Sequence, residues 1–292
     1  MKNIERNIPY DPEVLNKLHR LQVEMLKDLD EICSANDINY TAVFGTALGA
    51  ERHQGFIPWD DDIDVCMLRE DYEKFLKVMA TNPNDKYKMI TPSLDKNYAC
   101  CVPKFQRKGT KFVSALSKNL KCDQCIFIDI FPFDKVAPNK KEMKKQHLIT
   151  LLYDRLIYLC GSAHPIIPYK GIKYGVASII CWIAHYLMKI FHISPKFIYK
   201  LYTKECMKYS NAESLEFTYF GDGMSLMARV HKEDLFPVKY VKFENVMIPV
   251  PHNNKNILTK SYGDYMQLPP VEDRVNHAPL IIDFGDFERE GK

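Results

Sequence analysis

Three aspartates stand in settings that suit metal-dependent phosphate chemistry. Asp62 and Asp64 are two positions apart in an acidic and apolar run, so a strand over residues 60–67 would present both carboxylates on one face. Asp129 is the single acid of an apolar run, where an uncompensated charge is costly to bury. Because grouped carboxylate oxygens suit Mg²⁺ or Mn²⁺, we predict that all three bind the metal and are catalytic. A solvated acidic loop or a surface calcium site is the alternative.

Candidate phosphate-binding residues accompany these acids in the sequence. Gly45 and Thr46 follow an apolar run, and a glycine and a hydroxyl between a strand and a helix are typical of phosphate sites. Lys104 and Arg107 lie in a basic stretch and are candidates to bind the diphosphate of a donor. Ordinary turns and solvated basic surface have the same composition, and they remain the alternatives.

Apolar periodicity predicts an α+β fold with a mixed sheet that positions these residues. A helix of about six turns should begin at Asp11, and residues 45–49 should form a tight turn before a short helix. The expected strands are residues 38–44, 60–67, 98–105, 111–114, 126–131, 238–243 and 246–250. Further helices are expected at residues 70–79, 140–160, 172–191, 195–209 and 254–261.

The change in character after Pro138 divides the chain into three parts. We expect residues 1–137 to form a catalytic core, 138–212 a lysine-rich helical insertion that faces the membrane or the acceptor, and 213–292 a part that completes the core and active site. Within the insertion, residues 174–193 are apolar for long runs. An amphipathic helix on a membrane surface and a buried packing helix fit this stretch about equally, and a transmembrane span is less favoured.

Composition excludes other classes of protein. The 292 residues are 46% hydrophobic and 26% charged, as in folded soluble chains, and a net charge of +3 is too small to indicate a nucleic-acid partner. The first residues contain no apolar signal-peptide segment, so we expect a cytoplasmic protein, with peripheral contact at the inner face of the plasma membrane.

The nine cysteines predict reduced thiols in that compartment. Cys100, Cys101, Cys122 and Cys125 offer four ligands for a structural Zn²⁺. This Zn²⁺ site is the less favoured interpretation, because neighbours in a strand point to opposite faces.

Several stretches resemble the LicD family of phosphocholine transferases, which has the fukutin-related proteins as relatives. They are FGTALG at residues 44–49, GFIPWDDDIDV at 55–65 with Arg52 before it, FIDIFP at 127–132, and a tail with YGDYM at 262–266, Arg274 and His277. The resemblance implies a nucleotidyltransferase-like fold, with the metal on Asp62 and Asp64 and with Asp129 completing an acidic triad. Arg52, His53, Arg274 and His277 are candidates to contact the donor or the acceptor.

The activity that this resemblance implies is transfer of a phospho-alcohol, most often phosphocholine from CDP-choline, to a sugar of a cell-surface glycan or a lipid-linked precursor, with release of CMP. Lipopolysaccharide and teichoic acid are the usual acceptors in the family. A DxD-type glycosyltransferase could instead place Asp62 and Asp64 on a nucleotide sugar, although no nucleotide-binding fold precedes the acid pair. A noncatalytic, membrane-associated glycan-binding protein is the second alternative, although such a protein has no need of a complete acidic set.

Overall fold

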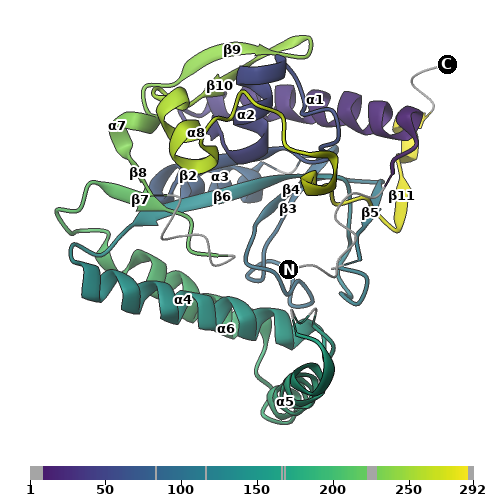
Figure 1. Ribbon diagram of the computed structural model, residues 1–292, viewed down its shortest axis with the longest axis vertical. Helices are drawn as coiled ribbons and strands as arrows, with labels where there is room; N and C mark the ends of the chain where they lie inside the picture. The colour runs from purple at the N-terminus through teal and green to yellow at the C-terminus, as the bar shows by residue number, and fades with distance from the viewer. Residues whose placement is uncertain are drawn as a thin grey trace.

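A mixed sheet forms the centre of the molecule. The computed structural model describes residues 9–82, 84–115, 117–165, 167, 169–221 and 229–288, and Figure 1 shows their arrangement. The main path of the seven-stranded sheet is β1 (Thr41–Ala42), β2 (Asp64–Leu68), β6 (Phe127–Lys135), β4 (Lys104–Arg107) and β3 (Tyr87–Ile90). Strand β7 (Glu216–Thr218) pairs with β6 and with β8 (Val230–His231). Only the pairing of β2 with β6 is parallel within this described sheet, which confirms the mixed α+β prediction.

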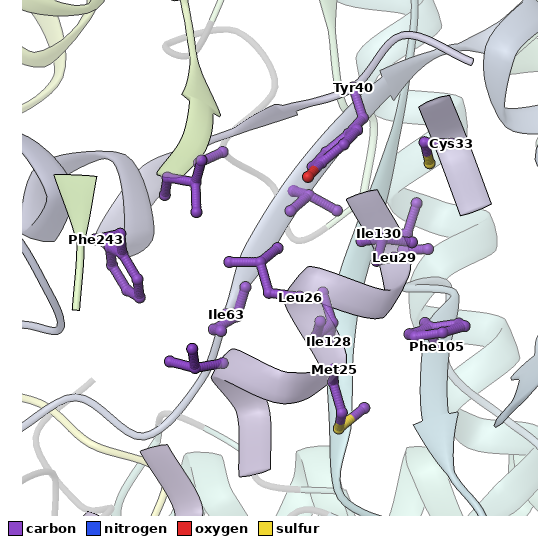
Figure 2. Close-up of a cluster of buried hydrophobic side chains, with 14 of the residues drawn as sticks. Met25, Leu26, Leu29, Cys33, Tyr40, Ile63, Phe105, Ile128, Ile130 and Phe243 are labelled. Carbon is purple, nitrogen blue, oxygen red and sulfur yellow. The ribbon is translucent and has the colours of Figure 1, made fainter. Parts of the chain in front are cut away.

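Helix α1 (Pro12–Ala35) closes one face of the sheet, as its periodicity predicted. The Asp11 carboxylate caps the helix by accepting hydrogen bonds from the backbone N–H groups of Glu13 and Val14. Apolar residues at helical spacing then point into the main core, where they meet side chains of β2, β4 and β6 (Figure 2). Met25, Leu26 and Leu29 are among the residues that are almost fully buried there.

The chain around Gly45 and Asp62 folds differently from the prediction. The strand expected over residues 38–44 is only β1, because the chain turns at Phe44, whose φ is 48°, and helix α2 (Phe44–His53) begins there. Gly45 and Thr46 therefore lie in the first turn of a helix, and the expected tight turn is absent. Strand β2 begins only at Asp64, so Asp62 precedes the strand. The strand expected over residues 98–105 is likewise confined to β4, and residues 98–103 are irregular with a bend at 101–102.

The remaining elements of the first and last parts of the chain surround this core. Helix α3 (Arg69–Thr81) follows β2, as predicted. The hairpin of β9 (Lys239–Phe243) and β10 (Val246–Val250), and helix α8 (Asn254–Tyr262), are also confirmed. Short elements missed in the sequence are β3, β7, β8, α7 (Lys232–Leu235), η2 (Val271–Asp273), β11 (Ile281–Asp283) and η3 (Gly285–Glu288). Strand β11 pairs with the predicted β5 (Lys111–Val113), which brings the C-terminal segment back to the core.

Three long helices of the middle part pack together on the other side of the sheet from α1 (Figure 1). They are α4 (Lys140–Gly161), α5 (Gly171–Ile190) and α6 (Pro195–Cys206), and the short η1 (Met207–Tyr209) follows, close to the predicted bounds. These helices share a second apolar cluster that includes Ile157, Met188 and Ile198. The division at residues 137 and 212 stays a prediction, although the helical character of the middle part is confirmed.

Candidate active site

Pairing of three strands brings two acids and a lysine to one level. Asp64 of β2 is the register partner of Asp129 of β6, and Asp129 is the register partner of Lys104 of β4. The backbone N–H of Asp129 donates a 2.9 Å hydrogen bond to the carbonyl oxygen of Ile63, which fixes this register beside the acidic run. Neighbouring side chains of paired strands lie on the same face, so the three charged groups gather at one place.

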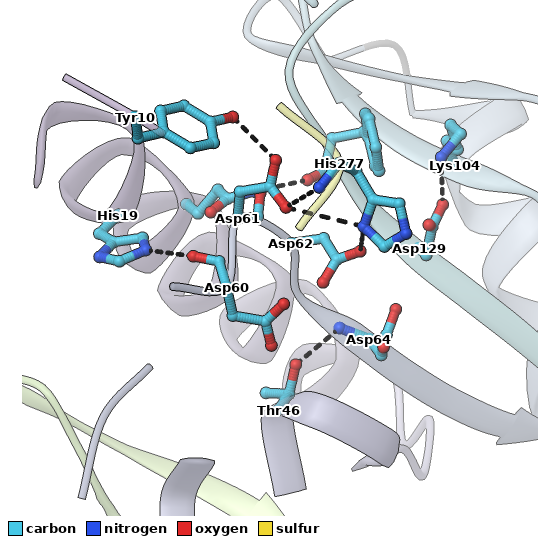
Figure 3. Close-up of polar contacts among 12 residues, drawn as sticks. Tyr10, His19, Thr46, Asp60, Asp61, Asp62, Asp64, Lys104, Asp129 and His277 are labelled. Carbon is cyan, nitrogen blue, oxygen red and sulfur yellow. Dashed lines mark hydrogen bonds and ion pairs between the residues drawn. The ribbon is translucent and has the colours of Figure 1, made fainter. Parts of the chain in front are cut away.

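Asp62 joins this group from the segment just before β2. One carboxylate oxygen from each of Asp62, Asp64 and Asp129 lies within 4.8 Å of the other two, so the predicted convergence of the three acids is present (Figure 3). All three side chains are only partly exposed. An oxygen-only donor set of this charge fits a hard divalent cation such as Mg²⁺ or Mn²⁺.

The pKa values of these carboxyls show how poorly the protein alone supports their charge. Burial, and then the neighbouring Asp62 and Asp129, raises the pKa of Asp64 well above its ordinary value. Burial also raises the pKa of Asp129, although Lys104 opposes that effect. At Asp62, burial acts to raise the pKa, but the hydrogen bond and charge of His277 and the charge of Lys104 together outweigh it, so the pKa is lowered. A bound cation would relieve the repulsion that remains.

Lys104 lies in the site and Arg107 does not. The Lys104 ammonium is 2.5 Å from an oxygen of Asp129 and 3.2 Å from the centre of the Phe127 ring. The Arg107 guanidinium lies instead 4.0 Å from the Glu24 carboxylate of α1 and over the Tyr87 ring. Residues three apart in a strand point to opposite faces, which separates these two candidate diphosphate ligands.

Gly45 and Thr46 contact the acids directly. The Thr46 hydroxyl accepts a 2.8 Å hydrogen bond from the backbone N–H of Asp64 and so fixes the start of β2 (Figure 3). A Cβ atom at Gly45 would lie 2.6 Å from a carboxylate oxygen of Asp60, so glycine leaves the space that this acid occupies. Both residues therefore position acids in this structure, and phosphate binding by them stays a prediction.

Asp61 and its partners form a polar cluster that sequence reasoning missed. Its side chain is 1% exposed and accepts 2.8 Å hydrogen bonds from the hydroxyl of Tyr10 and from the backbone N–H of His277. The carbonyl oxygen of Asp61 also accepts a 3.0 Å bond from the amide of Gln22. Asp61 thus joins the two ends of the chain to the acidic run, and the available sequence signal was the unbroken series of three aspartates.

His277 is the one predicted contact residue whose side chain pairs with the acids among the described residues. Its Nδ1 lies 3.2 Å from Asp62 and 3.6 Å from Asp61, and the side chain is 51% exposed. Hydrogen bonds to Asp61 and then to Asp62 raise the pKa of His277 to about 11. The imidazole is therefore a cation that faces both the acids and the solvent.

The other contact candidates hold the C-terminal segment near the site. The Arg52 guanidinium donates hydrogen bonds to the Tyr265 carbonyl oxygen at 2.6 Å and to the His53 ring at 2.9 Å. The Arg274 guanidinium stacks 4.2 Å from the centre of the Trp59 ring, just before the acidic run. Tyr262, which the sequence did not suggest, is close enough for the acids to raise its pKa further after burial has raised it.

The four cysteines considered for zinc do not form a metal-binding group in the part of the chain that the structure describes. The two candidate groups found there are Asp62, Asp64 and Asp129, and Asp61, Asp62 and His277. Cys125 instead donates a hydrogen bond to the Asp123 carboxylate, and all four thiols are free. The zinc hypothesis therefore has no support from the described residues.

One protein of known activity resembles this chain along most of its length, and other proteins resemble parts of it. The model of the LicD/FKTN/FKRP nucleotidyltransferase domain matches residues 37–157. The lipopolysaccharide cholinephosphotransferase LicD of Haemophilus influenzae is 30% identical over 269 residues, which cover 89% of this chain and 95% of that protein. An uncharacterised protein of Rickettsia typhi is 30% identical over 118 residues, which cover 38% of this chain and 37% of that protein. An uncharacterised protein of Rickettsia prowazekii is 36% identical over 78 residues, which cover 27% of this chain and 28% of that protein.

These matches and the acidic cluster define the class of protein, which is a transferase enzyme. The chain belongs to the LicD family, because its similarity to the Haemophilus influenzae protein extends over nearly the whole of both.

Proposed function

We propose that this protein is a metal-dependent phosphotransferase that moves phosphocholine from CDP-choline to a sugar hydroxyl of lipopolysaccharide or of its precursor and releases CMP. The observation that carries the proposal is the convergence of Asp62, Asp64 and Asp129 beside Lys104. The full-length similarity to a lipopolysaccharide cholinephosphotransferase supports both the donor and the acceptor. Under this proposal, the core is a nucleotidyltransferase-like domain, and the enzyme works in the cytoplasm at the inner face of the plasma membrane.

In the proposed mechanism the acids would hold Mg²⁺ or Mn²⁺, which supplies charge neutralisation for the donor's diphosphate when bound. The sugar oxygen attacks the phosphorus atom that carries choline, and the bond from that phosphorus to the oxygen shared with CMP breaks in line. Asp129 accepts the proton of the sugar hydroxyl, and CMP leaves with the bonding electron pair. Asp129 suits this role because its carboxylate lies among the acids of the site and is held in place by Lys104.

Lys104 and His277 supply the positive charges that face the same place. Lys104 pairs with the Asp129 carboxylate. When Asp129 takes up the proton and loses its charge, the Lys104 ammonium can stabilise the negative charge on the phosphate oxygens instead. His277 pairs with Asp62 and is half exposed, so its free edge can contact the donor or the acceptor. The positions of these two cations favour a donor with a negatively charged diphosphate over a neutral ligand.

A donor screen tests the proposal. The purified full chain with Mg²⁺ is incubated with CDP-choline, CDP-ethanolamine, CDP-glycerol, CDP-ribitol, and UDP- and GDP-sugars, with and without lipopolysaccharide, and release of the nucleotide is measured. We expect CMP release from CDP-choline that increases with the acceptor. A preference for nucleotide sugars would favour a glycosyltransferase, and metal binding without turnover of any donor would favour a noncatalytic glycan-binding protein.

The matched variants for this screen are Asp64→Asn and Asp85→Asn. Asp64 lies in the acidic cluster, whereas Asp85 is exposed on the chain before β3. We expect Asp64→Asn to lower kcat by about a thousandfold or more and Asp85→Asn to leave it unchanged. Turnover by folded Asp64→Asn at the rate of the Asp85→Asn control would refute the assignment.

A further inference from the structure

Helix α5 presents its apolar side to the solvent. Of its most apolar 18-residue window, 11% is buried, although the helix is long and apolar enough to cross a membrane by length and composition. The outward side chains include Ile172, which is 88% exposed, and Ile179, which is 61% exposed. At about 100° per residue, the exposed Ile172, Val176, Ile179, Ile183 and Ile190 all point within about 40° of one direction. A helix of a water-soluble domain turns such a stripe toward the core.

The opposite side of α5 is fixed to α4. His185 and Met188 are buried, and the His185 ring nitrogen Nδ1 lies 2.6 Å from the carbonyl oxygen of Leu159. The Cys160 thiol of α4 contacts the Met188 sulfur at 3.6 Å. Figure 1 shows α5 beyond α4, as the helix farthest from the sheet. The apolar stripe is therefore held outward by defined contacts and is not a loose end of the chain.

Lysines border the stripe on both sides. Lys173 and Lys189 lie about 90° and 110° to either side of its centre, one near each end of the helix. Long lysine side chains in these positions can reach lipid headgroups while the isoleucines enter the acyl region. The uncharged helix between them, residues 174–188, is about 22 Å long, which is shorter than the roughly 30 Å of a bilayer's hydrocarbon core. These positions favour a helix that lies in the surface of a membrane over one that crosses it.

The net charge of the helical part indicates which kind of membrane surface it would bind. Residues 138–212 contain 12 Lys and Arg and 3 Asp and Glu, a net charge of +9, whereas the whole chain carries +3. The rest of the chain therefore carries −6. A local excess of this size attracts anionic phospholipid headgroups. It also repels a second copy of the same helical part, which argues against a homodimer through this stripe.

We propose that α5 docks the protein on anionic lipid bilayers, with the stripe of Ile172, Val176, Ile179, Ile183 and Ile190 entering the acyl boundary. Trp182 and Tyr186 are exposed beside this stripe, and such side chains prefer the headgroup level. Lipid binding itself does not depend on the proposed function. The role that we assign to this binding, which is to bring the active site to a lipid-borne glycan, does rest on the proposed function.

Flotation with vesicles tests the docking. The full chain is mixed with vesicles of phosphatidylglycerol and phosphatidylcholine, or of phosphatidylcholine alone, and the floated fraction is measured. We expect binding to the anionic vesicles that weakens as salt increases. Ile179→Glu with Ile183→Glu should lower the partition coefficient about a hundredfold, because two apolar contacts are replaced by charges that the lipid repels. Lys173→Gln with Lys189→Gln should lower it about tenfold on anionic vesicles only.

The matched control is Met247→Glu with Leu280→Glu, which changes two side chains of similar exposure, 56% and 58%, outside the helical part. This control should float like the wild type. Circular dichroism checks that each variant is folded, and CMP release with a soluble acceptor should be equal in all of them. The proposal is overturned if the wild type remains in the unfloated fraction with anionic vesicles, or if the isoleucine variant floats with them like the control. It is also overturned if sedimentation shows a lipid-free dimer that the isoleucine variant abolishes.

Discussion

At the scale of single residues, Asp64 is an acid whose charge the fold supports poorly. Its hydrogen-bonded backbone places it beside Asp62 and Asp129, and burial combined with these neighbours raises its pKa. A carboxyl whose pKa is higher in the folded state than in the unfolded state binds more protons when folded. The free energy of unfolding of the metal-free protein therefore falls as pH rises above the unfolded pKa of Asp64.

The first prediction follows from that sign. In EDTA at pH 7, Asp64→Asn should have a Tm a few degrees higher than the wild type, because the variant removes an unsupported charge. The difference should shrink as pH falls toward the unfolded pKa of Asp64 and vanish below about pH 3, where Asp64 is protonated in both states. Added Mg²⁺ should raise the Tm of the wild type and leave that of Asp64→Asn nearly unchanged. Thermal scans at several pH values measure this, and a lower Tm of the variant in EDTA at pH 7 would contradict it.

The second prediction concerns the two basic residues of β4. Lys104→Gln should lower kcat/KM about a hundredfold, because it removes the cation beside Asp129. Arg107→Gln is the matched control and should change kcat/KM less than about threefold, because its guanidinium contacts Glu24 and Tyr87 on the side of α1. Steady-state rates of CMP release compare the two variants. A larger effect at Arg107 would show that the donor's diphosphate binds elsewhere.

At the scale of elements, close packing at the end of α4 supports the segment that leads to Lys104. A Cβ atom at Gly161 would lie 2.5 Å from the Cβ of Ala99 and 2.7 Å from Leu120. Both neighbours are buried or packed against the second apolar cluster. Helix α4 and the segment that precedes β4 therefore share a contact in which a side chain has no room.

The third prediction compares two glycines of this helical part. Gly161→Ala should lower the free energy of unfolding by about 1–3 kcal/mol, because the added methyl group overpacks this contact. Gly175→Ala in α5 meets open space and should raise the free energy of unfolding by about 0.5–1 kcal/mol, because alanine favours the helix. Urea unfolding of both variants provides the measurement. Equal stability of the two would mean that Ala99 and Leu120 move away without cost.

At the scale of the whole molecule, the acidic run holds both ends of the chain in place. Tyr10 and His277 lie 51 and 216 positions from Asp61, yet both donate hydrogen bonds to its carboxylate. The C-terminal segment is also tied to the core by the pairing of β11 with β5 and by Arg52. Completion of the site therefore depends on the return of the C-terminal segment.

The fourth prediction tests that dependence. Asp61→Ala leaves the Tyr10 hydroxyl and the His277 N–H without their acceptor, so the free energy of unfolding should fall by about 2–4 kcal/mol. Hydrogen exchange at the His277 amide should become faster, because the C-terminal segment opens more often. Tyr10→Phe is the control that removes one of the two bonds, and it should leave this amide protected. Unchanged exchange in Asp61→Ala would show that other contacts hold the segment.

The sequence by itself determined the patterns that are local. The spacing of apolar residues and the Asp11 cap gave α1, because an i, i+3, i+4 repeat is a property of neighbouring residues. The same holds for the long helices of the middle part. The three catalytic candidates were recognisable because burial of an acid together with its apolar neighbours costs free energy in any fold.

Only the tertiary structure decided which side chains meet. The sequence offered Lys104 and Arg107 as equals, and the opposite faces of β4 separated them. It did not reveal that Gly45 makes room for Asp60, or that His277 pairs with Asp62 from the far end of the chain. Such contacts depend on the register of strands and the path of loops, which residues distant in sequence fix jointly. The direction of the apolar stripe of α5 was undecided for the same reason, because periodicity gives a stripe but not its partner.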